Sequence, residues 1–443
     1  MNVRIPAKGA VSLLVKRYAG PFWLRRKWLN KTQWLSTADL QTLQLMLLQK
    51  LIRHCYNSVP YYRKIMDERG ISPESIKTLE DIKQFPILTK KDVLLAGDSI
   101  ISTKYPRWLL VKAYTGGTTG TPLTLRRSMF SIGNEHAFVR RQWDWAGVQF
   151  GVRCAYLTGR LIAKPDQING QLYAYDPIMK ELILSTYHLS KNTAGQYASA
   201  IKHYGIKAIA GYPSAVCLLA QTCLDTGIDL KVPAVLTSSE VLTESMRKTI
   251  CEAFECRIFD FYGSAERVCY IQTCDHGSYH VIPEYGLTEL IPLDKSDATE
   301  FKIVATGFWN FAMPFIRYDV GDLVIKSDNR CPCGRQFPTI KSISGRQADT
   351  IKTPSGREFG AAILTHLLYG TDHIVESQIV QDATDHITIR YVPTQRFSTA
   401  DLQDFKNLIA KHLPSELKVT FEQTEAIEKT DTGKLRPVVS KIA

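Results

Sequence analysis

The sequence of 443 residues lacks several features that define common protein classes. No apolar run approaches the roughly 20 residues that a membrane-spanning helix needs. The apolar patch "AVSLLV" near the N-terminus is shorter than the core of a secretory signal peptide. The ten cysteines do not have the spacing of a small disulfide-stabilised domain. We therefore expect a cytoplasmic protein.

Acidic residues are scarce at the N-terminus, where residues 1–70 hold 13 Lys and Arg but only three Asp and Glu. Trp23, Trp28 and Trp34 alternate there with basic residues in "FWLRRKWLNKTQWL". Such a mixture is typical of segments that rest on an anionic membrane, and nothing in it resembles a nucleic-acid-binding motif. We expect a helical arm packed on its own domain, with peripheral membrane contact as the alternative and no nucleic-acid partner.

The chain is longer than one hydrophobic core usually fills, so at least two packed units are expected. Leu and Ile recur at helical spacing over residues 37–57, and short β-type runs alternate with helices from about residue 107. This alternation predicts parallel sheets covered by helices. Beyond residue 345, two alternating strand patterns and one helical segment predict a separate α+β unit.

A phosphate-binding lysine is also missing from the stretch "YTGGTTGTPLTL" at residues 114–125. The Walker motif needs a Lys followed by Ser or Thr, so this stretch does not belong to a P-loop ATPase. Glycines let the backbone approach a ligand closely, and peptide N–H groups and Thr hydroxyls suit anionic oxygens. The stretch is interpreted as a phosphate-binding loop, with an ordinary loop between strands as the alternative.

Five further motifs follow the glycine loop in order: "LTSSEVLT", "FDFYGSAER", "IRYDVGDLV", "ISGRQADTIKTPSG" and "EKTDTGKLRP". In this order and spacing, the six motifs resemble the adenylate-forming superfamily of acyl-CoA synthetases, luciferases and peptide-synthetase adenylation domains. Within it, the sequence is similar to the phenylacetate-CoA ligase branch, and especially to its CapK-type members of capsular polysaccharide biosynthesis. The resemblance covers roughly residues 40–440.

The resemblance implies a role for each motif. The glycine loop would hold the β- and γ-phosphates of ATP, Tyr262 would stack on the adenine, and Lys434 would reach the substrate carboxylate and the α-phosphate. The catalytic candidates are Lys434 and Glu266, the latter as the Mg²⁺ ligand. The acyl-pocket candidates are Tyr212 and Ser214. The ATP- and AMP-binding candidates are Thr115, Gly116, Gly117, Thr118, Thr119, Gly120, Ser239, Glu240, Tyr262, Gly263, Ser264, Asp322 and Arg346.

The chemistry requires these residue types, because a carboxylate and a polyphosphate repel each other. Lys434 supplies a cation at the point of attack, and Mg²⁺ on Glu266 would neutralise the departing pyrophosphate. Many relatives close the glycine loop with a lysine, whereas this sequence has Leu123 at the matching position. The phenylacetate ligase branch also lacks that lysine. The alternatives are a solvated surface lysine at position 434 and an ordinary Gly-Asp turn at Asp322.

Fold and reaction follow from the same resemblance. We expect an α/β protein whose large N-terminal domain of helix-covered, mostly parallel sheets spans residues 1–346, helical and basic over 1–106. A hinge at 347–349, with Ala348 where many relatives have Asp or Lys, leads to a small, mobile α+β C-terminal domain at 350–443.

ATP and a carboxylic acid would give acyl-AMP, and CoA would accept the acyl group. The alternatives are a carrier-protein thiol or sugar amine as acceptor, or a non-catalytic nucleotide-binding descendant; the acid and the oligomeric state, with a homodimer as one alternative, stay open.

Two motifs contain a second candidate site: "TCDHGSYH" and "RCPCGRQFP". Two Cys separated by one residue, with a distant Cys and His, form the soft ligand set that Zn²⁺ prefers. The predicted ligands are Cys274, His280, Cys331 and Cys333, with His276 as the competing ligand. Four protein ligands leave no open position, which predicts a structural ion; the arrangement is similar to a zinc site in some phenylacetate-ligase-like proteins. The alternative is free cysteines in a loop.

Overall fold

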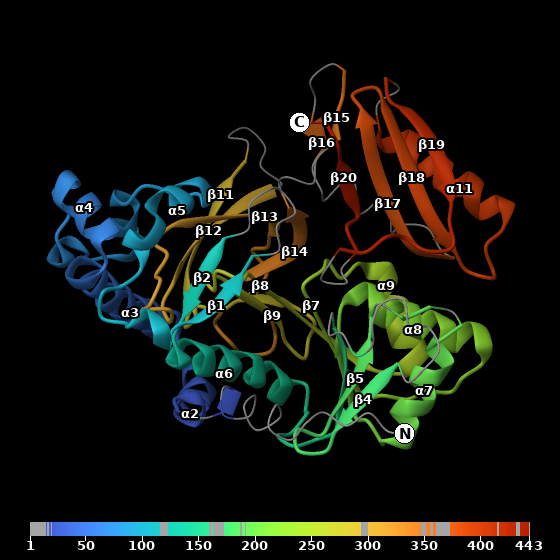
Figure 1. Ribbon diagram of the computed structural model, residues 1–443, viewed down its shortest axis with the longest axis horizontal. Helices are drawn as coiled ribbons and strands as arrows, with labels where there is room; N and C mark the ends of the chain where they lie inside the picture. The colour runs from blue at the N-terminus through green and yellow to red at the C-terminus, as the bar shows by residue number, and fades with distance from the viewer. Residues whose placement is uncertain are drawn as a thin grey trace. The chain divides into compact units, whose positions relative to one another are not determined.

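The computed structural model describes residues 15, 17–18, 20–115, 123–158, 162, 172–186, 188–190, 192–293, 300–346, 351–354, 358–359, 373–413, 416–430 and 435–442. The chain forms two compact units, each built from segments far apart in the sequence (Figure 1). The N-terminal unit contains Val11–Trp145 and Phe261–Ser342, and the C-terminal unit contains Ala146–Asp260 and Ile343–Ala443.

The N-terminal unit begins with a series of helices. A long amphipathic helix starts after Ser36, whose side chain accepts a hydrogen bond from the Asp39 N–H and so caps the first turn. The elements are α2 (Phe22–Thr32), α3 (Thr37–Ser58), α4 (Pro60–Arg69), α5 (Lys90–Ala96) and α6 (Met129–Trp145), four 3₁₀ turns (Pro73–Ser75, Leu79–Gln84, Gly97–Ile100 and Arg107–Leu109), and the antiparallel hairpin of β1 (Val111–Tyr114) and β2 (Thr124–Arg127).

The sheet of the N-terminal unit is antiparallel in its assigned registers. Short turns connect several neighbouring strands, and only antiparallel strands can be joined in this way. The strand order is β11 (Gly286–Pro292), β12 (Glu300–Gly307), β13 (Tyr318–Lys326), β14 (Thr339–Arg346), β10 (Tyr279–Val281), β9 (Tyr270–Thr273) and β8 (Arg257–Gly263). β8 and β14 each begin in one unit and end in the other.

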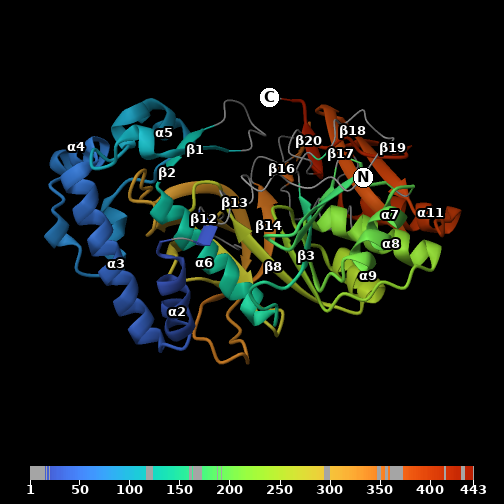
Figure 2. The same cartoon turned by 60° about the horizontal axis from the view of Figure 1, so that its bottom comes forward.

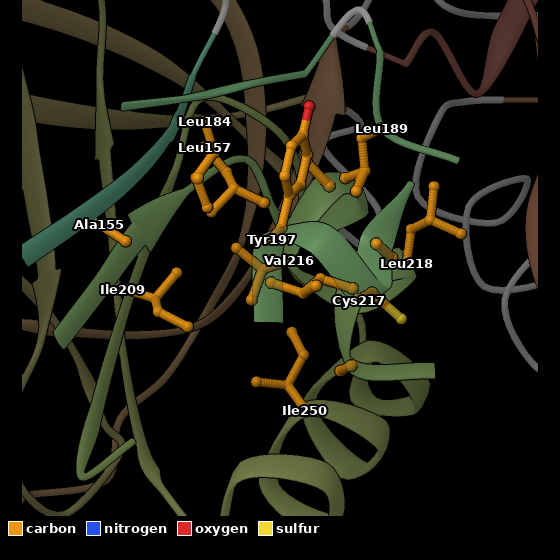
Figure 3. Close-up of a cluster of buried hydrophobic side chains, with 14 of the residues drawn as sticks. Ala155, Leu157, Leu184, Leu189, Tyr197, Ile209, Val216, Cys217, Leu218 and Ile250 are labelled. Carbon is orange, nitrogen blue, oxygen red and sulfur yellow. The ribbon is translucent and has the colours of Figure 1, made fainter. Parts of the chain in front are cut away.

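The strands of residues 146–260 in the C-terminal unit pair mostly in parallel, as predicted, and one pair, Tyr173–Asp176 with Glu181–Ser185, is antiparallel. Every residue of β5 (Glu181–Ser185) and β6 (Ala208–Gly211) is buried, as expected for strands that are covered on both faces. The elements are β3 (Cys154–Thr158), β4 (Tyr173–Asp176), β5 (Glu181–Ser185), α7 (Ala194–His203), β6 (Ala208–Gly211), α8 (Pro213–Thr226), β7 (Ala234–Ser238) and α9 (Glu244–Phe254). Figure 3 shows the core between them, where Tyr197, Ile209 and Ile250 come from a helix, a strand and a further helix. The α/β class is therefore confirmed.

The last part of the chain forms a four-stranded sheet with its own core. Ile379, Ile387 and Phe405 are fully buried in that core. Its elements are β17 (Ile374–Ala383), β18 (His386–Pro393), α11 (Thr399–His412), β19 (Lys418–Gln423) and β20 (Val438–Ser440), preceded by the short hairpin of β15 (Ile351–Lys352) and β16 (Glu358–Phe359). The strand order is β19-β18-β17-β20. The predicted hinge at 347–349 lies outside the described residues, so the domain boundary and the mobility stay predictions.

The basic helix α2 packs against α6 of its own unit (Figure 2). The Arg25 guanidinium donates to Asn134 Oδ1 at 2.7 Å and lies 3.6 Å from the centroid of the Trp309 ring. Arg26 forms an ion pair with Asp144 at 2.8 Å. Two of the basic side chains that define this segment therefore hold the helix in place.

The outer side of α2 and the residues after it leave large apolar side chains exposed. Trp23, Leu24 and Trp34 are all exposed, so contact with an anionic membrane remains a prediction for this segment. Within the described ranges, no helix is long and apolar enough to cross a bilayer.

A completely buried ion pair connects α6 to the segment before β11. Arg141 and Glu284 are both 0% exposed, and their side chains approach to 2.8 Å. Glu284 also accepts a hydrogen bond from the Thr32 hydroxyl at 2.9 Å. The rings of Trp145 and Phe337 lie 5.1 and 5.4 Å from the guanidinium. A buried charge without its partner is strongly destabilising, so this pair fixes how α2, α6 and β11 meet.

We expect Glu284→Gln to lower the free energy of unfolding by about 3–5 kcal/mol, because it leaves the Arg141 charge buried and uncompensated. Urea unfolding followed by tryptophan fluorescence measures this change. Glu255→Gln is the matched control, since Glu255 pairs with Lys231 on the surface, and it should leave the curve unchanged. Equal effects of the two substitutions would contradict the prediction.

Candidate functional site

Two predicted site residues meet at the end of β8. Tyr262 lies on β8 and Asp322 on β13, and the Tyr262 hydroxyl donates to Asp322 Oδ2 at 2.5 Å. Burial, together with the Asp322 charge, raises the pKa of Tyr262 well above its usual value. The phenol therefore stays protonated, and its ring is held in place at the edge where a nucleotide base is predicted to bind.

The turn that precedes Asp322 has its own support. Gly321 adopts a left-handed φ of 76°, a conformation that glycine takes without strain. The Gly321 N–H donates to Asp319 Oδ1, and the other oxygen of Asp319 pairs with Lys302 at 2.9 Å. Of the two acidic residues in this motif, Asp319 thus supports the turn, whereas Asp322 faces Tyr262.

Glu266, the predicted Mg²⁺ ligand, is half-buried just after β8. It accepts a hydrogen bond from the Tyr318 hydroxyl at 3.1 Å. Arg127, at the end of β2, donates to the backbone oxygen of Ala265. The strand that follows the glycine loop therefore contacts the residue next to Glu266.

Tyr318 and Arg127 were not recognised from the sequence. Tyr318 stands inside the motif "IRYDVGDLV", but nothing in the spacing indicates that its side chain reaches Glu266. Arg127 lies two residues beyond the stretch at residues 114–125, and this proximity was its signal in the sequence.

The hairpin holds the two ends of the glycine loop together. The Thr115 N–H donates to the Leu123 oxygen at 3.1 Å, and the Leu123 N–H donates to the Thr115 hydroxyl at 2.9 Å. The Leu123 side chain is buried, which explains why an apolar residue is suited to this position. The candidates Gly116, Gly117, Thr118, Thr119 and Gly120 lie outside the described residues.

Four further candidates belong to the C-terminal unit. Ser239 follows β7 in a left-handed conformation, with φ of 72°. The carboxylate of Glu240 accepts hydrogen bonds from the Ser214 N–H at 3.0 Å and the Leu435 N–H at 2.9 Å. Tyr212 precedes α8 and is buried, as is Ser214.

Two candidates cannot be placed in full. Lys434 lies outside the described residues, and for Arg346 only the backbone, at the end of β14, is described. Gly263 ends β8, and Ser264 follows it, two residues before Glu266.

The structure brings the four predicted zinc ligands together in the N-terminal unit. The side-chain ligand atoms of Cys274, His280, Cys331 and Cys333 all lie within 4.8 Å of one another. Sγ of Cys274 is 3.5 Å from Sγ of Cys331, and Sγ of Cys333 is 3.5 Å from Nε2 of His280. Tetrahedral coordination with ordinary zinc–ligand bond lengths separates ligand atoms by about 3.5–3.8 Å, so the donor set fits this ion.

The alternative ligand, His276, is exposed and lies beside Asp275. Burial lowers the pKa of His280 to about 4, so its imidazole is neutral, as metal binding requires. Burial also raises the pKa of Cys274 to about 12. A thiolate at that position therefore needs a cation beside it.

Comparison with known proteins supports the motif assignment. Residues 351–441 match the CapK C-terminal domain family. Protein CapK of Staphylococcus aureus is 26% identical over 100% of this chain and 97% of its own length. A phenylacetate-coenzyme A ligase of Thermus thermophilus is 26% identical over 70% of this chain and 71% of its own length.

A likeness to solved structures extends the comparison to the fold. The crystal structure of 2-hydroxyisobutyryl-CoA ligase in the postadenylation state, in complex with 2-HIB-AMP, has a TM-score of 0.73 at 18% identity. The match covers 92% of this chain and 91% of that chain. The resemblance inferred from the six motifs is thus confirmed: the chain is similar to CapK and to phenylacetate-CoA ligases, shares the fold of a CoA ligase, and matches the CapK C-terminal domain family at residues 351–441.

Proposed function

We propose that the protein is an AMP-forming ligase that activates a carboxylic acid with ATP and transfers the acyl group to CoA. The observation that carries this proposal is the meeting of Tyr262 and Asp322, two candidates that are distant in sequence, at the end of β8. Glu266 follows on the same segment. Sequence similarity to phenylacetate-CoA ligases supplies the reaction class.

In the first step, the substrate carboxylate attacks the α-phosphorus of ATP, and the bond to the pyrophosphate oxygen breaks. Lys434 lowers the repulsion between the two anions, because its ammonium group is attracted to both. The Glu266 carboxylate, oriented by Tyr318, would hold Mg²⁺, which neutralises charge on the departing pyrophosphate. Tyr262 and Asp322 bind the base and the ribose of the nucleotide.

In the second step, a thiol attacks the acyl carbon, and AMP leaves. CoA is the proposed acceptor. The similarity to CapK spans the whole chain, whereas the similarity to the phenylacetate-CoA ligase spans 70% of it. Because the similarity to CapK extends further along the chain, a carrier-protein thiol and a sugar amine are the alternative acceptors to be tested beside CoA.

We further propose that the cluster of Cys274, His280, Cys331 and Cys333 binds a structural zinc ion. The cluster joins the β9–β10 hairpin to the segment between β13 and β14. Its four ligands would complete the tetrahedron and leave no position for substrate, so the ion contributes to stability rather than to the reaction.

Pyrophosphate exchange into ATP, measured with pooled aryl, fatty and amino acids and with or without CoA, tests the proposed activity. We expect exchange to depend on one acid and to fall by about two to three powers of ten in Lys434→Ala, because one charge is lost at the reacting phosphate. Lys418→Ala is the matched control, since Lys418 lies exposed on β19 and pairs with Asp385. Full activity of Lys434→Ala, or silence of the wild type with every pool, would refute the proposal.

Metal analysis tests the zinc proposal. We expect about one zinc ion per purified chain, and we expect Cys331→Ser to lose it and to melt about 5–10 °C lower, because metal binding contributes directly to folding. Cys251→Ser is the control, since Cys251 is a free cysteine in the C-terminal unit. A wild-type protein without zinc, or a Cys331→Ser variant that keeps it, would contradict the assignment.

A further inference from the structure

The outer face of α2 combines large apolar side chains with basic ones. At about 100° per residue, the exposed positions of this helix fall within an arc of about 120°. The helix contains no acidic residue. The exposed members of the outer face are Trp23, Leu24, Lys27, Asn30 and Lys31, together with Trp34, which follows the helix.

The opposite side of α2 is already occupied within the N-terminal unit. Its buried residues pack against α6, and Figure 2 shows the two helices side by side. Arg25 and Arg26 are used on this inner side, because each of them bonds to a polar side chain of α6. Packing and internal pairing therefore explain the two arginines but not the residues of the outer face.

The basic residues of the outer face are lysines. Lys27 and Lys31 are both exposed, and within the described ranges neither of them forms an ion pair of the kind that Arg26 forms with Asp144. An arginine suits fixed bidentate contacts, whereas a lysine is a flexible point charge. Such a charge is attracted to a diffuse anionic surface without one defined partner.

Trp34 is exposed and is nevertheless held in place. The guanidinium carbon of Arg335 lies 4.9 Å from the centroid of the Trp34 ring. Arg335 also donates to Gln33 Oε1 at 3.1 Å, and the Trp145 indole N–H donates to the same oxygen at 2.8 Å. Because the ring and the residue before it both have fixed contacts, Trp34 loses little conformational freedom when it meets a partner.

We propose that the outer face of α2 binds the surface of an anionic lipid membrane. Tryptophan rings and lysine stems are suited to the boundary between headgroups and acyl chains, and Leu24 adds apolar area at that boundary. The lysine charges are attracted to the lipid phosphates, which are spread over the whole surface. This inference does not depend on the proposed ligase activity.

A bilayer surface uses both the charged and the apolar groups of this face, whereas other partners use only one kind. A second copy of the chain would bring two lysine-bearing faces together, and like charges are unfavourable across an interface. Nucleic acid would use the charges, but proteins that bind its backbone typically make about 6–10 phosphate contacts. The two lysines are few by comparison.

Cosedimentation of the full chain with vesicles tests the inference. We expect binding to equimolar phosphatidylcholine and phosphatidylglycerol and much weaker binding to phosphatidylcholine alone, because the second surface has no net charge. Lys27→Gln combined with Lys31→Gln should weaken binding about 25-fold, since each lysine contributes about fivefold near an anionic surface.

Lys64→Gln combined with Lys83→Gln is the matched control, because both lysines are exposed in the same unit and the loss of charge is equal. No binding to the anionic vesicles, equal binding to both kinds of vesicle, or equal weakening by both pairs of substitutions would overturn the inference. Substitutions of exposed residues usually change stability little, and thermal melting of each variant confirms that it is folded.

Quenching of tryptophan fluorescence by lipids with brominated acyl chains locates the contact. We expect quenching in the wild type and the loss of most of it in Trp23→Phe combined with Trp34→Phe, because only an indole near the acyl chains is quenched. Phenylalanine keeps an aromatic ring, so this variant should still sediment with the vesicles. Trp108→Phe is the matched control, since Trp108 is exposed in a separate turn of the same unit. An unquenched wild type, or quenching that only Trp108→Phe removes, would overturn the inference.

Two further outcomes would assign the outer face to a different partner and overturn the membrane inference. One is a dimer in the absence of vesicles that Leu24→Ser dissociates, as sedimentation velocity would show. The other is binding to a DNA duplex, without binding to vesicles, that the substitutions at Lys27 and Lys31 weaken.

Discussion

Buried charge is the constraint on which the described architecture depends. An ionised group removed from water is stable only where partners replace its hydration. Arg141 and Glu284 meet this requirement through each other, completely out of contact with solvent. Because one of them lies on α6 and the other before β11, the helical layer and the sheet of the N-terminal unit are joined by a contact with fixed geometry.

The same constraint shapes the candidate site. Asp322 is held by a phenol and Glu240 by two backbone N–H groups. Neither carboxylate depends on an arginine or lysine side chain in these bonds. In these bonds, both carboxylates are oriented by neutral donors.

The sequence predicted those parts of the site that depend on short local motifs. The order of six short motifs identified the superfamily, and the cysteine and histidine pattern selected Cys274, His280, Cys331 and Cys333, which the structure brings together. Periodicity likewise predicted α3, because the apolar face of a helix is visible along a single segment.

The rest depended on contacts between distant segments. The bond from Tyr318 to Glu266 and the bond from Leu435 to Glu240 join residues 52 and 195 positions apart. No local pattern encodes such pairs, because any tyrosine or backbone N–H has the same chemistry until folding places it. For the same reason, the antiparallel pairing of the N-terminal unit was not foreseen from strand patterns alone.

The interleaving of the two units has a consequence for how the chain folds during synthesis. The core around α8 includes Val375, Val392, Ile427 and Leu435 from the last part of the chain. Residues 146–260 therefore leave the ribosome before the side chains that complete their core exist. Contacts between such distant segments form slowly, and the exposed apolar surface is prone to aggregation in the interval. Deletion of the final 70 residues would leave the apolar surface around α8 permanently exposed.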